Sequence, residues 1–181
     1  MNDSKRTSAW IQTYTGKQFW PLDAKPEEVH IEDIAHALSM LCRFNGHLER
    51  FYSVAEHSVY VSQIVSEENQ LWGLLHDSAE AYLSDIPSPV KIHLNKFKKI
   101  ENRLLGVICN RYKLSQNMPP EIKLADMVLL STEKKVLMKK EPVTWGSLPE
   151  PSDKITIAAL SPEKAKALFL ARYNAITDRY L

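Results

Sequence analysis

Apolar residues recur at helical spacing in several separate stretches of the chain. Ile31, Ile34, Ala35 and Leu38 fall on one stripe, which predicts an amphipathic helix within residues 26–44. The same spacing predicts further helices over residues 53–65, from residue 71 to the proline-containing stretch at 85–89, and over residues 93–112, 119–136 and 161–176. The pattern therefore predicts a chain that is mostly helical.

Capping residues mark several helix starts. Ser53 precedes a helical pattern, and Glu56 follows three residues later, which predicts a capping box. Ser161 and Pro162 occupy the cap and the first position of the last helix. In the helix of residues 26–44, Arg43 would lie at the C-terminal end, where a cation suits the helix dipole.

Two stretches depart from the helical pattern. WIQTYTGKQFWPL has short alternating runs on either side of Gly16, which predicts a β-hairpin turning near Thr15-Gly16-Lys17. Trp20 and Leu22 then either complete the helical core or form a flat wall for a nucleobase. Residues 154–158 alternate weakly and predict a short strand, placed beside the hairpin. The expected fold is all-α, a helical bundle with a small N-terminal β-hairpin.

Length and composition fit one ordinary globular domain spanning residues 1–181. The chain carries a net charge of +1, so no global charge attracts it to nucleic acid or to anionic lipid. No apolar run approaches the roughly 20 residues needed to cross a bilayer, and the first residues lack the apolar core of a signal peptide. Cys42 and Cys109 lie in apolar contexts and are expected to be reduced, which predicts a cytoplasmic protein.

Polar residues interrupt one apolar helix at an unusual place. His76 and Asp77 follow Leu74 and Leu75 directly, and Glu80 comes three and four residues later. On a helix these offsets place Glu80 on the same face as the pair. Burying a histidine with two carboxylates is costly unless something offsets the charge, and a metal ion would do so.

Two other helices carry similar interruptions. His57 lies on an apolar face, where it is either a hydrogen-bonded core histidine or a metal ligand. Asp126 breaks the apolar stretch of its helix, and it either faces outward toward Lys123, pairs with a buried arginine, or binds a metal. Together with His76 and Asp77, these residues bring imidazoles and carboxylates from three predicted helices toward one interior. That set suits zinc, manganese, cobalt or iron.

The order H…HD…D resembles that of the HD-domain metal-dependent phosphohydrolases, an all-helical family. The segment HDSAEAYLSDIPSPVK is similar to the bacterial 5′-deoxynucleotidases of that family, which carry HD, then Glu, then Asp-x-Pro-x-Pro-x-Lys. Arg43-Phe44 falls where those enzymes carry an arginine followed by an aromatic residue that meets the nucleotide. TYTGKQFWPLD, CRFNGHLERFYSVAEHS and KLADMVLLSTEKK resemble small phage and prophage members, among them phage dATP triphosphohydrolases. The resemblance covers about residues 13–135.

The resemblance implies a role for each matching residue. His57, His76, Asp77 and Asp126 would bind the metal, and a second ion such as magnesium would accompany a triphosphate. Glu80 would orient or deprotonate the attacking water or protonate the leaving oxygen, while Asp85 would do the other half of that work or hold the sugar 3′-hydroxyl. Candidate substrate-binding residues are Arg43, Phe44, His47 and Lys91, with Arg50 and Lys134 as further phosphate candidates and Trp20, Leu22 and Pro89 as a base pocket.

The resemblance implies hydrolysis of dATP to deoxyadenosine and triphosphate. The alternatives are a 5′-deoxynucleotidase acting on deoxynucleoside monophosphates and, from another class, a nucleotide-binding module that has lost catalysis. The lysines at 96, 98 and 99 form either a solvated face or part of a polyphosphate site. The expected partner is a small deoxynucleotide, with no nucleic acid and no membrane, and the exposed-looking Trp145 loop predicts a homo-oligomer.

Overall fold

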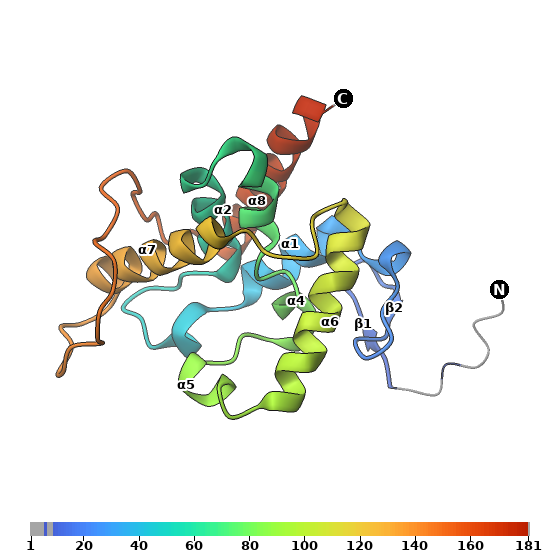
Figure 1. The fold of residues 1–181 in the computed structure, drawn as a ribbon, viewed down its shortest axis with the longest axis horizontal. Helices are drawn as coiled ribbons and strands as arrows, with labels where there is room; N and C mark the ends of the chain where they lie inside the picture. The colour runs from blue at the N-terminus through green and yellow to red at the C-terminus, as the bar shows by residue number, and fades with distance from the viewer. Residues whose placement is uncertain (1–5, 7–8, 181) are drawn as a thin grey trace.

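The computed structural model describes Arg6 and residues 9–180. Its strands are β1 (Ile11–Gln12) and β2 (Gln18–Phe19). Its α-helices are α1 (Ile31–Met40), α2 (Val54–Ile64), α3 (Gln70–Leu75), α4 (Glu80–Leu83), α5 (Ser88–Lys91), α6 (Asn95–Tyr112), α7 (Pro120–Leu137) and α8 (Pro162–Thr177). The prediction of an all-α fold with a small N-terminal hairpin is confirmed (Figure 1).

Helix α2 is the centre of the bundle. Every residue from Val54 to Ser62 is buried, and α2 packs against α1, α3, α7 and α8. One apolar core cluster, which includes Ile34, Leu74 and Phe169, fills the space between α1, α3 and α8. A second cluster lies on the α7 side of α2. A helix buried on all sides leaves its polar residues without water, so each of them needs a partner inside the protein.

The hairpin forms where it was predicted. β1 and β2 pair antiparallel with Ile11 opposite Phe19, and Gly16 at the turn has a φ of 81°. Buried Asp33 of α1 accepts hydrogen bonds from the backbone N–H and the hydroxyl of Thr15, at 2.7 and 3.0 Å. Phe19 stacks on Tyr82, with ring centroids 4.0 Å apart. These contacts fix the hairpin to α1 and to α4.

The first predicted helix ends earlier than residue 44. Helix α1 stops at Met40, because the chain then turns extended and Cys42 forms an antiparallel bridge with Ser53. The N–H of Arg43 donates to the carbonyl of Tyr52 at 2.9 Å. Arg43 therefore does not lie in a helix C-terminus, and that interpretation of its charge is wrong.

The helix predicted from residue 71 is broken in the middle. Helix α3 ends at Leu75, α4 begins at Glu80, and the turn between them is held by bonds of the i to i−3 type, such as Ser78 N–H to Leu75 O at 3.0 Å. Helix α4 ends at Leu83, and the residue that follows it, Ser84, has a φ of 74°. His76 and Asp77 thus lie in a turn, with a backbone less regular than the helix that was expected.

The strand predicted over residues 154–158 is absent from the described chain. The backbone N–H groups of Ala158, Ala159 and Leu160 donate instead to the buried carboxylate of Glu56, at 2.8–3.1 Å. The capping box is consequently only half formed: the Ser53 hydroxyl accepts from the N–H of Glu56 at 3.2 Å, but the Glu56 side chain binds the C-terminal segment. Within the described residues, no helix is both long enough and apolar enough to cross a bilayer.

A candidate metal centre and its adjoining cavity

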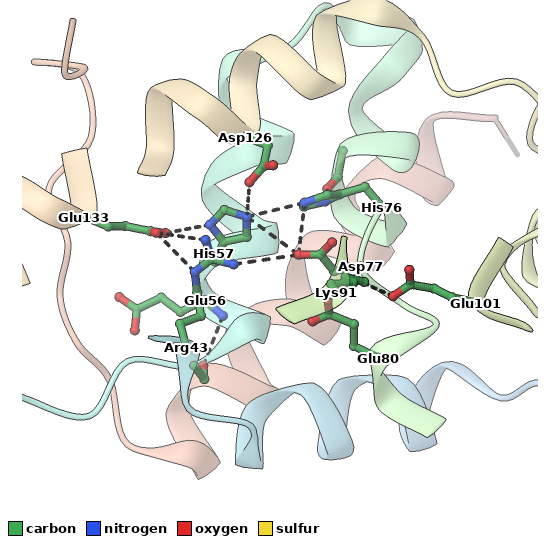
Figure 2. Close-up of polar contacts among 12 residues, drawn as sticks. Arg43, Glu56, His57, His76, Asp77, Glu80, Lys91, Glu101, Asp126 and Glu133 are labelled. Carbon is green, nitrogen blue, oxygen red and sulfur yellow. Dashed lines mark hydrogen bonds and ion pairs between the residues drawn. The ribbon is translucent and has the colours of Figure 1, made fainter. Parts of the chain in front are cut away.

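Helix α2 places His57 at the centre of a polar cluster inside the bundle. The side chain is fully buried, and its Nε2 lies 3.2 Å from Oδ1 of Asp126 and 3.4 Å from Nε2 of His76 (Figure 2). Asp77 reaches the same place, with Oδ2 3.2 Å from His76 Nε2 and 3.8 Å from His57 Nε2. All four residues predicted as metal ligands are therefore brought together.

The turn after α3 orients His76. Its Nδ1 donates to the carbonyl of Gly73 at 2.8 Å, which leaves Nε2 as the free nitrogen facing His57. Gly73 is needed at this position, because a Cβ there would lie 2.9 Å from the Cα of Ser62 on α2. The close packing of α3 on α2 thus holds the Gly73 carbonyl in place, and this carbonyl orients the His76 ring.

Helix α7 supplies both Asp126 and the group that orients His57. Glu133 lies seven residues after Asp126, two helical turns along the same face. His57 Nδ1 donates to Oε1 of Glu133 at 2.6 Å, and Arg43 Nε donates to Oε2 at 3.1 Å. A carboxylate on the second nitrogen fixes the tautomer of a histidine and raises its basicity, as for histidines that bind metals. Glu133 is itself fully buried.

The electrostatics of the cluster favour a cation. Burial and the Arg43 charge lower the pKa of His57, but Glu133 and Asp126 outweigh them and raise it to about 9. Burial alone would raise the pKa of Asp77, yet His76, His57 and Arg43 hold it well below its usual range. Surroundings that draw a proton onto a buried imidazole attract a divalent ion for the same reason.

The donor set fits a metal ion. Ligand atoms of His57, His76 and Asp126 all lie within 4.8 Å of one another, and both imidazoles direct Nε2 inward. These three residues could therefore hold an ion, and Asp77 is close enough to join them. Two imidazoles with carboxylate oxygens suit zinc, manganese, cobalt or iron.

A cavity of about 540 Å³ adjoins these ligands. His76, Asp77, Asp126 and Glu80 line it, together with residues of α6 and α7. Glu80 is only 6% exposed, its Oε2 has no hydrogen-bond partner, and its Oε1 lies 3.6 Å from Nζ of Lys91. Burial, followed by the charges of Asp77 and Asp85, raises the pKa of Glu80 to about 10. A buried carboxyl with a free oxygen beside a candidate metal site is suited to acid–base chemistry.

The comparisons identify relatives along the whole chain. Over 172 residues the chain is 36% identical to the uncharacterized protein YfdR of Escherichia coli K12, covering 94% of this chain and 97% of YfdR. The chain belongs to the YfdR family. A second relative, an uncharacterized protein of Rhodobacter capsulatus, is 29% identical over 187 residues, covering 93% of this chain and 95% of the relative. No protein-family model matches the chain.

In this YfdR-family chain the other predicted substrate residues lie in three places. Arg43 borders the candidate metal cluster, with NH1 3.8 Å from Oδ2 of Asp77, and Lys91 lines the cavity. Asp85 is half-buried just after α4, and burial raises its pKa. The ring of Phe44 lies 6.3 Å from that of Trp145, and His47 lines a separate surface pocket with Trp145.

The predicted base pocket is not assembled at this cavity. The guanidinium of Arg6 covers the Trp20 ring at 4.5 Å, and Leu22 is 52% exposed. Pro89 is exposed in α5. None of these three is among the residues that line the cavity beside His76. Their assignment to a base pocket stays a prediction.

In this member of the YfdR family, the sequence did not reveal the residues that contact the candidate ligands and the cavity residues from outside the cluster. Glu133 was visible only as part of KLADMVLLSTEKK, and its seven-residue spacing from Asp126 was the available signal. Glu101 binds Lys91, with Oε1 2.5 Å from Nζ, and its position on α6 gave no sign of that contact. Lys98 and Lys123 also line the cavity. The sequence indicated Lys123 only as an outward neighbour of Asp126.

Proposed function

We propose that this chain is a metal-dependent deoxynucleotide phosphohydrolase of the HD-domain type. One observation carries the proposal: two buried imidazoles direct Nε2 at one point between Asp77 and Asp126, beside a cavity that Glu80 lines. The HD-domain resemblance of the sequence assigns these same residues to phosphoester hydrolysis. A module that only binds nucleotides has no evident need for all four candidate metal ligands together with Glu80.

His57, His76, Asp77 and Asp126 would hold the ion. A divalent ion at this place supplies a Lewis acid for a phosphoryl oxygen and a water of lowered pKa. Neighbouring residues decide which nitrogen of each histidine is free to bind the ion. Glu133 keeps the His57 lone pair on Nε2, and the Gly73 carbonyl does the same for His76.

Glu80 is the residue placed to move a proton. Glu80 lines the cavity and its Oε2 has no hydrogen-bond partner, and its high pKa would fall toward neutrality if positive charge were held between Asp77 and Asp126. A carboxyl near neutrality can accept a proton from water and return it to the leaving 5′-oxygen. Asp85 remains the candidate for the other proton or for the sugar 3′-hydroxyl.

Arg43 is the candidate phosphate clamp. Two of its nitrogens, Nε and NH2, bind Glu133 at 3.1 and 3.0 Å, while NH1 is directed toward Asp77. The guanidinium is therefore held rigidly and keeps one nitrogen for a phosphate oxygen. Attack at the α-phosphorus of dATP would release deoxyadenosine and triphosphate, as the resemblance to the phage enzymes implies.

A product assay tests the proposal. Protein loaded in turn with zinc, cobalt, manganese and iron is incubated with each dNTP and each dNMP, and nucleoside, phosphate and triphosphate are separated by chromatography. Deoxyadenosine with intact triphosphate from dATP is the expected result. Phosphate from dNMPs with dNTPs untouched would identify a 5′-deoxynucleotidase instead, and no turnover with any metal would refute the hydrolase.

Matched histidine variants assign the activity to the site. His76→Ala should abolish turnover, because it removes a ligand. His93→Ala serves as the control, since His93 is exposed and does not line the cavity. Equal activity in both variants would place the reaction elsewhere.

A further inference from the structure

Ser84 holds a backbone conformation that serine rarely adopts. Its φ of 74° and ψ of 156° fall in a region that glycine alone occupies without strain. The N–H of Ser84 donates to the carbonyl of Glu80 at 2.8 Å, which holds this conformation at the end of α4. The Ser84 side chain is exposed, and its hydroxyl forms no hydrogen bond in the part of the chain that the structure describes. No bond of that side chain therefore offsets the strain.

The segment that follows Ser84 lies outside the apolar core. It consists of residues 85–94 and includes α5, in which no residue is buried. Val90 and Ile92 are 52% and 58% exposed. Helix α5 packs against α6 at the lower edge of the molecule in Figure 1. A segment that buries so little apolar surface separates from the bundle more easily than the core helices do.

Two prolines make this segment stiff. Pro87 and Pro89 fix their own φ and restrict the residues that precede them. The N–H of Lys91 donates to the carbonyl of Pro87 at 2.9 Å, which closes the turn of α5. Freedom to rotate is thus left to the ends of the segment, at Ser84 and at Leu94, whose φ is −104° and ψ 64°. Such a segment moves as one unit, and its end residues absorb the change in φ and ψ.

An ion pair holds the segment against α6. Nζ of Lys91 lies 2.5 Å from Oε1 of Glu101 and 3.6 Å from Oε1 of Glu80 (Figure 2). Lys91 lines the cavity, and Asp85 at the other end of the segment is half-buried. Movement of the segment away from α6 would withdraw Lys91 from the cavity and expose Asp85.

We propose that residues 85–94 form a flap at the edge of the cavity, hinged at Ser84 and held closed by the ion pair between Lys91 and Glu101. In the closed position Ser84 is strained, and in the open position it relaxes to a negative φ. The strain favours opening and the ion pair favours closing, so the two positions are close in free energy. Opening of the flap admits a ligand to the cavity, whichever reaction takes place there.

Carboxyl footprinting measures how often the flap opens. The full-length protein is treated with a carbodiimide and glycine ethyl ester, and peptide mass spectrometry gives the labelling rate of Asp85, with exposed Asp153 as the internal reference. Ser84→Gly relieves the strain of the closed position, so we expect it to slow Asp85 labelling by about fivefold or more. Glu101→Gln breaks the ion pair and should speed that labelling by about threefold or more. Ser84→Ala keeps the Cβ and should label at the wild-type rate.

Urea unfolding provides the second readout. Glycine normally lowers stability relative to alanine, because it gains more backbone freedom in the unfolded chain. At position 84 we expect the opposite order, with a higher urea midpoint for Ser84→Gly than for Ser84→Ala, since only alanine keeps the strain of the native conformation.

The contrary outcomes are equally specific. Unchanged or faster labelling of Asp85 in Ser84→Gly, or a urea midpoint no higher than that of Ser84→Ala, would overturn the hinge. Unchanged labelling in Glu101→Gln would overturn the role of the ion pair. Neither measurement uses turnover, so a failed product assay would leave the flap in place, and a static segment would leave the proposed hydrolase untouched.

Discussion

Replacing Glu133 with glutamine tests whether this buried carboxylate positions His57. The wild-type side chain accepts from His57 Nδ1 through Oε1 and from Arg43 through Oε2. Glutamine keeps the shape but turns one of these acceptors into a donor. If the amide NH2 of the glutamine faces His57, Nδ1 must accept a hydrogen bond, so the ring proton moves to Nε2 and prevents that nitrogen from binding a metal. If it faces Arg43, two donors oppose each other in a buried site.

The expected magnitudes follow from the burial of all three groups. Loss of the partner that orients a metal-binding histidine weakens metal affinity by about 10- to 100-fold. Removing one charge from a buried ion pair lowers the free energy of unfolding by about 3 kcal/mol, because the Arg43 charge stays buried. The salt bridge between Arg43 and Glu133 has 11% and 0% side-chain exposure, so solvent screens it little.

Glu56→Gln is the matched control. Glu56 is also a fully buried carboxylate and precedes His57 on α2, but it binds backbone N–H groups of residues 158–160 and the hydroxyl of Tyr60. We expect Glu56→Gln to lose stability as well, while keeping its metal affinity. Urea unfolding in the presence of a chelator measures the stability, and competition with a chromophoric chelator measures the affinity. Unchanged metal affinity in Glu133→Gln, or an equal loss in Glu56→Gln, would refute the positioning role.

Three further predictions concern protonation and packing. In the metal-free protein the pKa of His57 is raised from 6.5 to about 9, so the stability from its bound proton is complete below pH 6.5 and is lost as pH rises through 9. The free energy of unfolding, measured with a chelator present, should fall by about 3 kcal/mol over that pH range. It should fall clearly less in Glu133→Gln, and an equal pH dependence in that variant and the wild type would contradict this explanation. Gly73→Ala should lower the free energy of unfolding by about 1–3 kcal/mol and weaken metal binding, because the new Cβ would clash with the Ser62 backbone. An unchanged midpoint of urea unfolding would contradict this. Burial raises the pKa of the Cys109 thiol to about 11, so a thiol reagent near pH 8 should titrate at most one cysteine in the native protein and two after unfolding, and two in the native state would be inconsistent with this structure.

The candidate metal ligands could be predicted because each one breaks a local pattern. His57, His76 and Asp126 are polar residues within apolar helical stretches, and that conflict is visible without any structure. Their convergence followed from the expectation that helices of a bundle turn their apolar faces toward one core. The hairpin was equally local, because Gly16 and the alternating runs on either side of it determine the turn.

What the sequence could not predict depends on long-range partners. Glu56 has the spacing of a capping box, but three N–H groups about a hundred residues later compete for its carboxylate and hold it. The same contact engages the N–H of Ala158, the last residue of the strand predicted over residues 154–158. Arg43 likewise looked like a helix-terminal cation, and its buried partner Glu133 lies ninety residues away in the chain.

One local rule was broken in a way that could have been read from the sequence. Helices α1, α2 and α8 each carry acidic residues in the first turn, as the helix dipole favours. Helix α6 carries none there and has Lys98 in its place, a choice that costs roughly 0.3–1 kcal/mol when no anion is present. Helices α3 and α5 also lack an acidic residue in the first turn, so tertiary packing rather than the helix dipole decides where these helices begin.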